Sequence, residues 1–413
     1  MEIGEPYISF VVTARNDDHG GNLLRRMQIF VTGLMEQAKK HNLSAELILV
    51  EWNPPPDRPR LFQALSWPEG PCRVRIIEVP YEIHRRFRHS DKLALFQMIA
   101  KNVGIRRAEG RFILATNIDL LFSDRLMSFL ASRSLKPQFM YRVDRYDVPG
   151  DVPTDVTIEE QLGYCQHNFI RVHMREGSFR KDALHWIWLR KTCARFAPLY
   201  RYLLGHLYNT MLRLSRVRRA RVRWPRFGLF TIERNSAGTM LKLMIPRVRL
   251  KPIIKRMRAS MLKAVLRIGN EIRRVRFLRY IFSRPYPLLH TNGCGDFTLI
   301  AREHWHALRG YPELEMFSFN LDSVLLHMAY QNGVRERIFR DPMRIYHIEH
   351  SSGWTPEGDR KMKERLRAMG IPMLGFPQFE SWAIRMQKEK RPMILNSEGW
   401  GLASDHLPET VVE

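Results

Sequence analysis

Residues 101–123 of the chain read KNVGIRRAEGRFILATNIDLLFS, and they carry its strongest structural signal. An apolar strand, FILA, runs directly into Asn117 and Asp119, which alternate along the chain and precede three more apolar residues. A carboxylate at the end of a buried strand is costly unless a partner compensates its charge. We therefore expect Asp119 to have such a partner. One candidate is a divalent cation. The other is the N-terminus of a helix starting at Arg125, which Asp119 or Ser123 could cap.

Strands and helices alternate along the chain around this segment. Apolar runs predict strands at 7–16, 45–53, 72–80, 111–119 and 138–149. Apolar residues at helical spacing predict an amphipathic helix over 22–42 and a second helix from a cap at Ser90 or Asp91 to Gly110. This alternation is typical of an α/β fold with a largely parallel sheet and helices on both faces.

Polar side chains gather at the ends of the predicted strands. They are Arg15, Asn16, Glu51, Asn117 and Asp119. In sheets of this kind, ligands bind beyond the carboxyl ends of the strands, where side chains from neighbouring strands meet. The sequence therefore predicts a ligand site at this edge of the sheet.

Two segments in the last third of the chain carry further candidate residues. In HTNGCGDFTLIARE (290–303), Gly293 and Gly295 flank a polar turn, which is either a close backbone approach to a ligand or an ordinary hairpin turn. A helix is predicted around 302–309 after it. In FSFNLDSVLLHMAYQNG (317–333), Asp322 opens an amphipathic helix. It is either a first-turn acid favoured by the helix dipole or a general base.

A pair of histidines follows in YHIEHSSGW (346–354). His347 and His350 are three residues apart, with Glu349 between them. In a strand, 347 and 349 share one face and 350 lies on the other. The pair is compatible with metal binding or with an ordinary structural role.

The positive charge of the chain is concentrated in one block. The 413 residues carry a net charge of +25, but residues 181–283 hold 26 Lys or Arg and three acids, so this block alone carries +23. Apolar residues at helical spacing over 198–223 and 251–282, with basic flanks, are typical of helices that lie in an anionic membrane interface. The alternatives are a packed helical subdomain and a nucleic-acid surface.

Other sequence features indicate the compartment. The start, MEIGEPYISF, is too acidic for a secretory signal. The sequence lacks an apolar run of about 18 residues, so we expect no spanning helix. The four cysteines, Cys72, Cys165, Cys193 and Cys294, lack metal-like spacing and are expected to be reduced thiols. We therefore expect a cytoplasmic protein that associates peripherally with a membrane.

Together these segments resemble an A-type glycosyltransferase, close to the large inverting family 2. ISFVVTARND (8–17) resembles the strand that reads the nucleotide base and ribose, and VEWNPP (50–55) resembles the second strand end, with Glu51 as the nucleotide-contacting acid. Residues 101–123 resemble the family's Asn-x-Gly, strand and Asp-x-Asp series. NGCGDFTLIAREHWHALRGYPE (292–313) is similar to the acceptor-side segment of a galactosyltransferase-type C-terminal domain.

The resemblance implies a nucleotide-sugar donor and a Mn²⁺ or Mg²⁺ ion held by Asp119 with His347 or His350. It implies that the donor's nucleotide is bound by Arg15, Asn16, Glu51, Lys101 and Asn117. It makes Asp322 the general base that takes the proton of an acceptor hydroxyl, with Asp296 as the second candidate. A single displacement then inverts the sugar configuration.

Two positions depart from the family pattern. The Asp-x-Asp motif reads Asn117–Ile118–Asp119, and the acidic pair before the acceptor helix reads Asn320–Leu321–Asp322, so one acid is missing from each. A non-catalytic nucleotide-binding scaffold is therefore an alternative to an enzyme.

The expected architecture is a GT-A-like α/β fold, that is, a Rossmann-type nucleotide-binding sheet with a basic helical insert. We expect a nucleotide-sugar half over 1–180, followed by the basic insert over 181–283. An acceptor half over 284–355 and a C-terminal extension over 356–413 complete the chain. The expected function is an inverting transfer of sugar to a glycan or lipid-linked acceptor at an anionic membrane surface. Nucleic acid is the less favoured partner of the insert.

Overall fold

The computed structural model describes residues 5–182, 231–235, 238–242, 285–350 and 356–412. The chain divides into two compact units, Met1–Lys181 with Pro285–Glu413, and Asp182–Arg284. In the second unit, the described residues form the hairpin β10 (Thr231–Asn235) and β11 (Gly238–Lys242). The helices expected over 198–223 and 251–282 lie outside the described residues.

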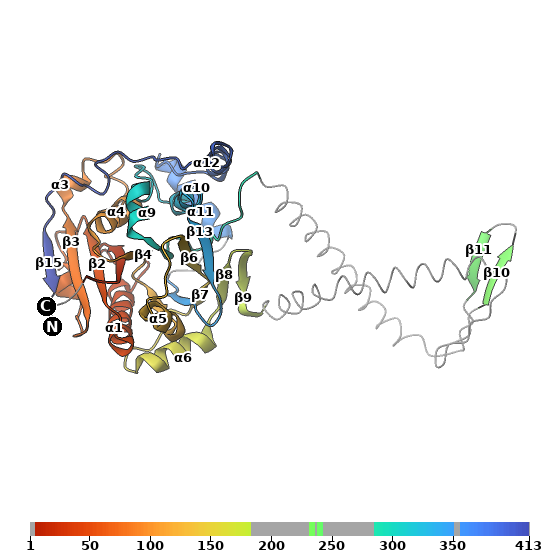
Figure 1. Cartoon of the computed structure of the whole chain (residues 1–413), viewed down its shortest axis with the longest axis horizontal. Coiled ribbons are helices and arrows are strands. Elements are labelled where there is room, and N and C mark those ends of the chain that lie inside the picture. The colour runs from red at the N-terminus through yellow and green to blue at the C-terminus, as the bar shows by residue number, and fades with distance from the viewer. Residues whose placement is uncertain (1–4, 183–230, 236–237, 243–284, 351–355, 413) are drawn as a thin grey trace. The chain divides into compact units, whose positions relative to one another are not determined.

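The first unit is built on a mixed eight-stranded sheet (Figure 1). Its order is β13 (Arg335–Phe339), β6 (Phe139–Val143), β12 (Phe297–Ala301), β4 (Phe112–Thr116), β1 (Ile8–Ala14), β2 (Ala45–Trp52), β3 (Cys72–Val79) and β15 (Glu409–Val412). Strands β4, β1, β2 and β3 pair in parallel, whereas β12 and β15 run antiparallel to their neighbours. The predicted α/β class is confirmed, and the antiparallel strands make the sheet mixed.

A second sheet contains five short strands. Its order is β5 (Leu120–Phe122), β14 (Ile345–Ile348), β7 (Arg145–Val148), β8 (Arg171–Met174) and β9 (Gly177–Arg180). The single strands predicted at 111–119 and 138–149 are wrong in extent, because the chain passes from the first sheet to the second after β4 and again after β6. The breaks fall at Asn117–Asp119 and at Asp144, whose side chains bond outside the strand ladders.

Helices cover both faces of the main sheet. One face packs on α1 (Leu23–His41) and α5 (Asp124–Ala131), and the other packs on α4 (Gln97–Arg107), α9 (Arg302–Leu308), α10 (Leu321–Gln331) and α12 (Phe376–Glu389). The remaining helices are α2 (Leu61–Ala64), α3 (Tyr81–His84), α6 (Ile158–Asn168) and α11 (Pro356–Ala368). Among the helices of the described residues, none has both the length and the apolar character needed to span a bilayer.

Helix α4 begins later than predicted. A start at Ser90 or Asp91 is wrong, since the helix begins at Gln97. The preceding residue, Phe96, is buried, and its ring lies 6.2 Å from that of Trp52 and 5.3 Å from that of Phe87, centroid to centroid. This packing holds the chain before α4 in an irregular path that local capping signals do not predict.

The Asn-x-Gly pattern in α4 has a packing explanation. The Asn102 side chain accepts a hydrogen bond from the Tyr311 N–H (2.8 Å) and donates one to the Tyr311 carbonyl oxygen (2.8 Å), so it joins α4 to the segment after α9. A Cβ atom on Gly104 would lie 2.6 Å from Val11 Cγ1 and 3.2 Å from Val50 Cγ2. Glycine therefore allows α4 to lie closely on β1 and β2.

The C-terminal segment completes the main sheet. Strand β15 pairs with β3 at the sheet edge (Figure 1). Arg75 on β3 donates to the carboxylate of Glu409 (2.6 Å) and to that of the buried Glu46 (3.1 Å). Because Glu46 is fully buried, the guanidinium groups that pair with it are needed to compensate its charge.

We predict that Gly104→Ala destabilises the protein by about 1–3 kcal/mol, because the added methyl group overpacks α4 against the sheet. The control is Gly163→Ala in α6, where a Cβ atom would meet nothing within 4 Å. That change should be neutral or stabilising, by up to about 1 kcal/mol, through helix propensity. Urea unfolding of both variants measures the difference, and equal stabilities would contradict the packing explanation.

Candidate metal centre and active site

Asp119 lies between β4 and β5 and faces two histidines, His347 on β14 and His350 just after it. Its Oδ2 atom lies 3.7 Å from Nε2 of His347 and 3.5 Å from Nε2 of His350. One donor atom from each of the three residues falls within 4.8 Å of the others. The expectation that 350 lies on the face opposite 347 is wrong. Strand β14 ends at Ile348, and the chain then brings the two imidazole rings to 5.6 Å, centroid to centroid.

The helix-cap alternative is right in position for Ser123 and wrong for Asp119. Ser123 is the N-cap residue of α5, but its side chain makes no capping bond there. Its hydroxyl instead accepts a hydrogen bond from the Arg344 N–H at 3.0 Å. The carboxylate of Asp119 is turned toward the histidines and accepts a hydrogen bond from the buried Arg26 at 3.1 Å.

The chemistry of the three donors suits a divalent cation. Asp119 Oδ1 is buried and has no hydrogen-bond partner among the described residues. Burial lowers the pKa of His350 to about 4, so this ring is neutral at pH 7 and could offer a lone pair to a cation. Burial would also lower the pKa of His347, but the charge of Asp119 and a contact with Asp147 raise it. Two imidazoles and one carboxylate favour Mn²⁺ over the harder Mg²⁺. The guanidinium of Arg26 weakens the attraction for any cation.

The glycine loop before α1 packs directly on this cluster. Gly20 has a φ of +75°, and a Cβ atom there would lie 2.4 Å from Nδ1 of His350. His19 also lies beside His350, with ring centroids 5.8 Å apart. Glycine is therefore required at position 20 both by the backbone conformation and by the imidazole against it.

The neighbours of Asn117 account for an amide at the position where the family resemblance implies a first acid. Its Oδ1 atom accepts a hydrogen bond from the buried ammonium group of Lys101 (2.8 Å), and its Nδ2 atom donates one to Asp296 (2.6 Å). An aspartate at this position would place two carboxylates in contact. Burial lowers the pKa of Lys101 to about 8, against the opposing effect of Asp296.

The two candidate bases have different surroundings. Asp296 is buried and is held by Asn117 and by Arg145 Nη1 (2.7 Å). Burial would raise its pKa, but Arg145 more than offsets this and the pKa is lowered. Asp322 is partly exposed in the first turn of α10, and its Oδ2 atom would lie 3.1 Å from a Cβ atom on Gly295. The glycine in the turn therefore leaves room for the Asp322 carboxylate.

Arg15, Asn16 and Glu51 meet around the segment 53–61, at the carboxyl ends of β1 and β2. Arg15 Nε donates to the Asn53 carbonyl oxygen (2.7 Å), and Asn16 Nδ2 donates to the Pro59 carbonyl oxygen (2.9 Å). Glu51 Oε2 accepts from the Leu61 N–H (3.0 Å), while burial raises the pKa of Glu51 to about 7. The predicted polar residues therefore form two clusters, this one and the one around Asp119 and Lys101.

Sequence reasoning missed four residues of the centre. They are Arg26, Arg145, Asp147 and His173. All four are buried or nearly so and lie in regular elements, where a charged side chain usually faces solvent. For Arg145 and Asp147, the usable signal was the four charged residues within the apolar strand predicted at 138–149.

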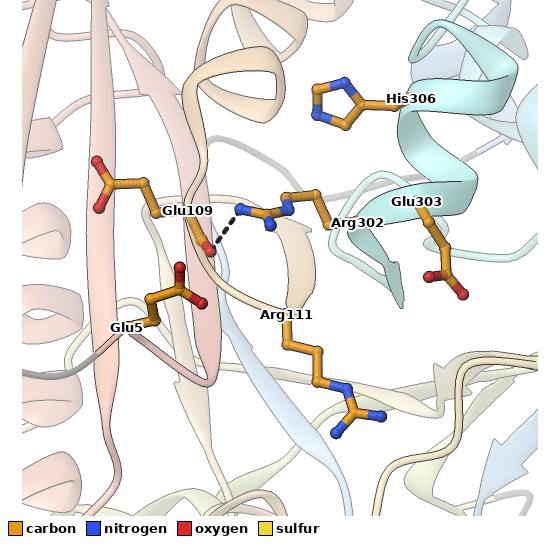
Figure 2. Close-up of a pocket in the computed structure, with 6 residues that line it drawn as sticks. All are labelled: Glu5, Glu109, Arg111, Arg302, Glu303 and His306. Carbon is orange, nitrogen blue, oxygen red and sulfur yellow. Dashed lines mark hydrogen bonds between the residues drawn. The ribbon is translucent and has the colours of Figure 1, made fainter.

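A pocket elsewhere on the first unit has a different character (Figure 2). Its lining residues are Glu5, Glu109, Arg111, Arg302, Glu303 and His306. Glu109 and Arg111 precede β4, whereas Asp119 follows it, so the pocket lies at the opposite end of that strand. Arg302 donates to the backbone carbonyl oxygen of Glu109 at 2.8 Å, and the Glu109 carboxylate accepts a hydrogen bond from Arg75 at 3.2 Å.

No protein-family model matches the chain, and no curated protein matches it. Among solved structures, it is similar to the mannosyltransferase PcManGT from Pyrobaculum calidifontis in complex with GDP-Man and Mn²⁺, at a TM-score of 0.36 and 11% identity over 94% of this chain and 74% of that one. It is also similar to GalNAc-T7 with UDP, GalNAc and Mn²⁺, at a TM-score of 0.38 and 10% identity over 96% of this chain and 54% of that one. The chain thus spans about half the length of GalNAc-T7. Identities this low establish neither a shared family nor a shared activity.

We predict that Asn117→Asp costs more than about 2 kcal/mol of unfolding free energy, because it puts a buried carboxylate against Asp296. Combining it with Asp296→Asn should recover part of the loss, since the carboxylate then faces Lys101 alone. Urea unfolding of the two single variants and the double variant measures this coupling. The control is Asn168→Asp, at an exposed position, and a similar loss there would contradict the explanation.

Proposed function

We propose that the protein is an inverting, metal-dependent glycosyltransferase that moves a sugar from a nucleotide-sugar donor to a hydroxyl of a glycan or lipid-linked acceptor. The observation that carries the proposal is the convergence of Asp119, His347 and His350 beyond the carboxyl end of β4. This is the edge at which α/β sheets bind ligands. The family resemblance of residues 101–123 supports the same assignment.

The nucleotide of the donor would lie over the carboxyl ends of β1 and β2. Arg15, Asn16 and Glu51 all bond to the segment 53–61 there. Asn16 and Glu51 are buried and would hold this segment in place beneath the nucleotide, whereas Arg15 is partly exposed and would face it. Glu51 keeps one buried oxygen, Oε1, without a hydrogen-bond partner among the described residues. Because Glu51 is buried, it would support the nucleotide site through the segment 53–61 rather than contact the base or ribose itself.

The diphosphate of the donor would lie near Asp119. Asp119, His347 and His350 would hold Mn²⁺ or Mg²⁺, which when bound neutralises the charge that develops on the leaving diphosphate. Lys101 adds a fixed positive charge behind Asn117. It is fully buried, so it supports the site from beneath without contacting the donor directly.

Asp322 is the proposed general base. Its carboxylate is partly exposed next to the turn at Gly295, so an acceptor hydroxyl can approach it. Asp296 is unsuited to this role, because both of its oxygens already accept hydrogen bonds from Asn117 and Arg145. Asp322 would take the proton as the hydroxyl oxygen attacks the anomeric carbon from the side opposite the diphosphate, which inverts the configuration.

We predict that UDP- or GDP-sugars raise the melting temperature of the wild type in the presence of Mn²⁺. Asp119→Ala should lose the Mn²⁺-dependent part of this shift. Asp322→Asn should keep the shift but lose transfer by about two to four orders of magnitude. The control is Asp155→Asn, at an exposed acid before α6, which should change neither.

The outcomes separate the proposal from its alternative. Donor binding without transfer or hydrolysis in the wild type would identify a non-catalytic nucleotide-binding scaffold. Nucleotide affinity that is unchanged when the metal is chelated would remove the cation from the proposal. Near-normal transfer by Asp322→Asn would remove that residue as the base.

The basic segment 181–283 adds docking on an anionic membrane surface to the proposal. Each Lys or Arg near such a surface contributes about 1 kcal/mol, and salt screens this attraction over about 10 Å. We therefore predict flotation with phosphatidylglycerol vesicles at low salt and release at high salt. Equal flotation with neutral vesicles would contradict the charge argument. A salt-sensitive shift of RNA or DNA without flotation would favour the nucleic-acid alternative.

A further inference from the structure

A line of polar side chains crosses the second sheet and ends at the candidate metal ligand His347. Ser178 on β9, His173 on β8, Asp147 on β7 and His347 on β14 lie on adjacent strands. His173 pairs with Ser178 in the β8–β9 register, and Asp147 pairs with His347 in the β7–β14 register. The four side chains are therefore held in sequence by the strands that carry them.

The first two contacts in this line are short. The Ser178 hydroxyl lies 2.6 Å from Nδ1 of His173, and Nε2 of His173 lies 2.7 Å from Oδ2 of Asp147. Asp147 is fully buried between two guanidinium groups, with Arg145 Nε at 2.9 Å and Arg171 Nη1 at 3.4 Å, so it is held as a carboxylate. An ionised carboxylate only accepts hydrogen bonds. His173 must therefore carry its proton on Nε2, and its Nδ1 accepts the proton of Ser178.

The same carboxylate faces His347 with its other oxygen. Asp147 Oδ1 lies 3.4 Å from Nδ1 of His347, while Nε2 of that ring points to Asp119 Oδ2 at 3.7 Å. Asp147 and Asp119 can both accept this proton, but the contact with Asp147 is the shorter one, and neither Asp147 Oδ1 nor His347 Nδ1 has another hydrogen-bond partner among the described residues, so Nδ1 is the favoured position of the His347 proton. The lone pair of Nε2 is then directed at the space shared with Asp119 and His350.

A second cation site and a hydrolase triad both suit this cluster less well. Asp147, His347 and Glu349 also lie close enough to hold a cation, but Arg145 Nε (2.9 Å) and Arg171 Nη1 (3.4 Å) already supply positive charge to Asp147. The order Ser–His–Asp is also that of a hydrolase triad. There the serine faces Nε2 and the aspartate Nδ1, whereas here the ring is reversed.

We infer that Asp147, oriented by His173, is a positioning residue that keeps His347 in the Nδ1–H tautomer and thereby directs its Nε2 lone pair to the cation. A carboxylate behind a ligating histidine fixes ring orientation and raises ligand basicity, and its loss typically weakens metal binding about 10- to 100-fold. This inference rests on the metal role of His347 in the proposed function. It adds an outer layer of residues, from Ser178 to Asp147, to the centre.

The test uses the full chain without nucleotide. The ¹⁵N shifts of the His347 ring in the metal-free wild type, recorded at a pH high enough to deprotonate the imidazolium, should be those of an Nδ1–H tautomer. Asp147→Asn should shift the ring toward the other tautomer and raise the Kd for Mn²⁺, measured by calorimetry, about 10- to 100-fold. The matched control is Asp144→Asn. Asp144 also pairs with a buried histidine, His290, at 3.0 Å, but that pair is not part of this line.

Each outcome has one meaning. A wild type that binds no Mn²⁺ overturns the metal role in the proposed function, and with it this inference. A wild type that binds Mn²⁺ together with an Asp147→Asn variant of equal affinity and unchanged tautomer overturns the inference alone. If Asp147→Asn does not fold, His173→Gln decides. It removes the orienting ring and leaves both carboxylates, and an unchanged Kd for Mn²⁺ in this variant contradicts the inference.

Discussion

The carboxylate of Asp119 is buried where the two sheets of the first unit meet, and it draws partners from both sides. Arg26 reaches it from α1, which packs on the main sheet, and the two histidines reach it from the end of β14 in the second sheet. Without such partners, the free-energy cost of burying this charge would exceed the stabilisation from the packing around it. The break after β4, the glycine loop before α1 and the end of β14 must therefore converge on one point. The need to compensate the buried charge of Asp119 therefore constrains both the fold and the candidate site.

Local sequence patterns were sufficient for the scaffold. Apolar runs predicted β1, β2 and β3, and helical spacing predicted α1 and α10. The same reasoning placed Arg15, Glu51 and Asp119 at strand ends. They failed where distant residues decide the path. The start of α4 depends on Phe96 packing against Trp52, far away in the sequence. The passage between sheets at Asp144 is hidden in an apparently continuous strand, because apolar residues lie on both sides of the break.

The chemistry of the centre was only partly predictable for the same reason. Asp119 and the two histidines could be named from their residue types and from the family resemblance. The role of Asn117 could not, because it depends on Lys101 in α4 and on Asp296, which is 179 residues away. By sequence alone, Asn117 looks like a lost metal ligand. In the structure, its amide joins the ammonium group of Lys101 to the carboxylate of Asp296. Charge balance of this kind is a property of the assembled cluster.

Strand β12 lies between β4 and β6, although in the chain it follows both of them and the whole second unit. During synthesis, β4 and β6 are made before β12, so the strand position between them in the sheet is still unfilled. The main sheet can close only after the ribosome has made the 182–284 segment and β12. An intervening segment is tolerated thermodynamically, since each doubling of a closed loop costs only about 0.6 kcal/mol. The consequence is kinetic. The edges of β4 and β6 that later pair with β12 stay unpaired until β12 is made, and unpaired strand edges expose a nascent chain to aggregation.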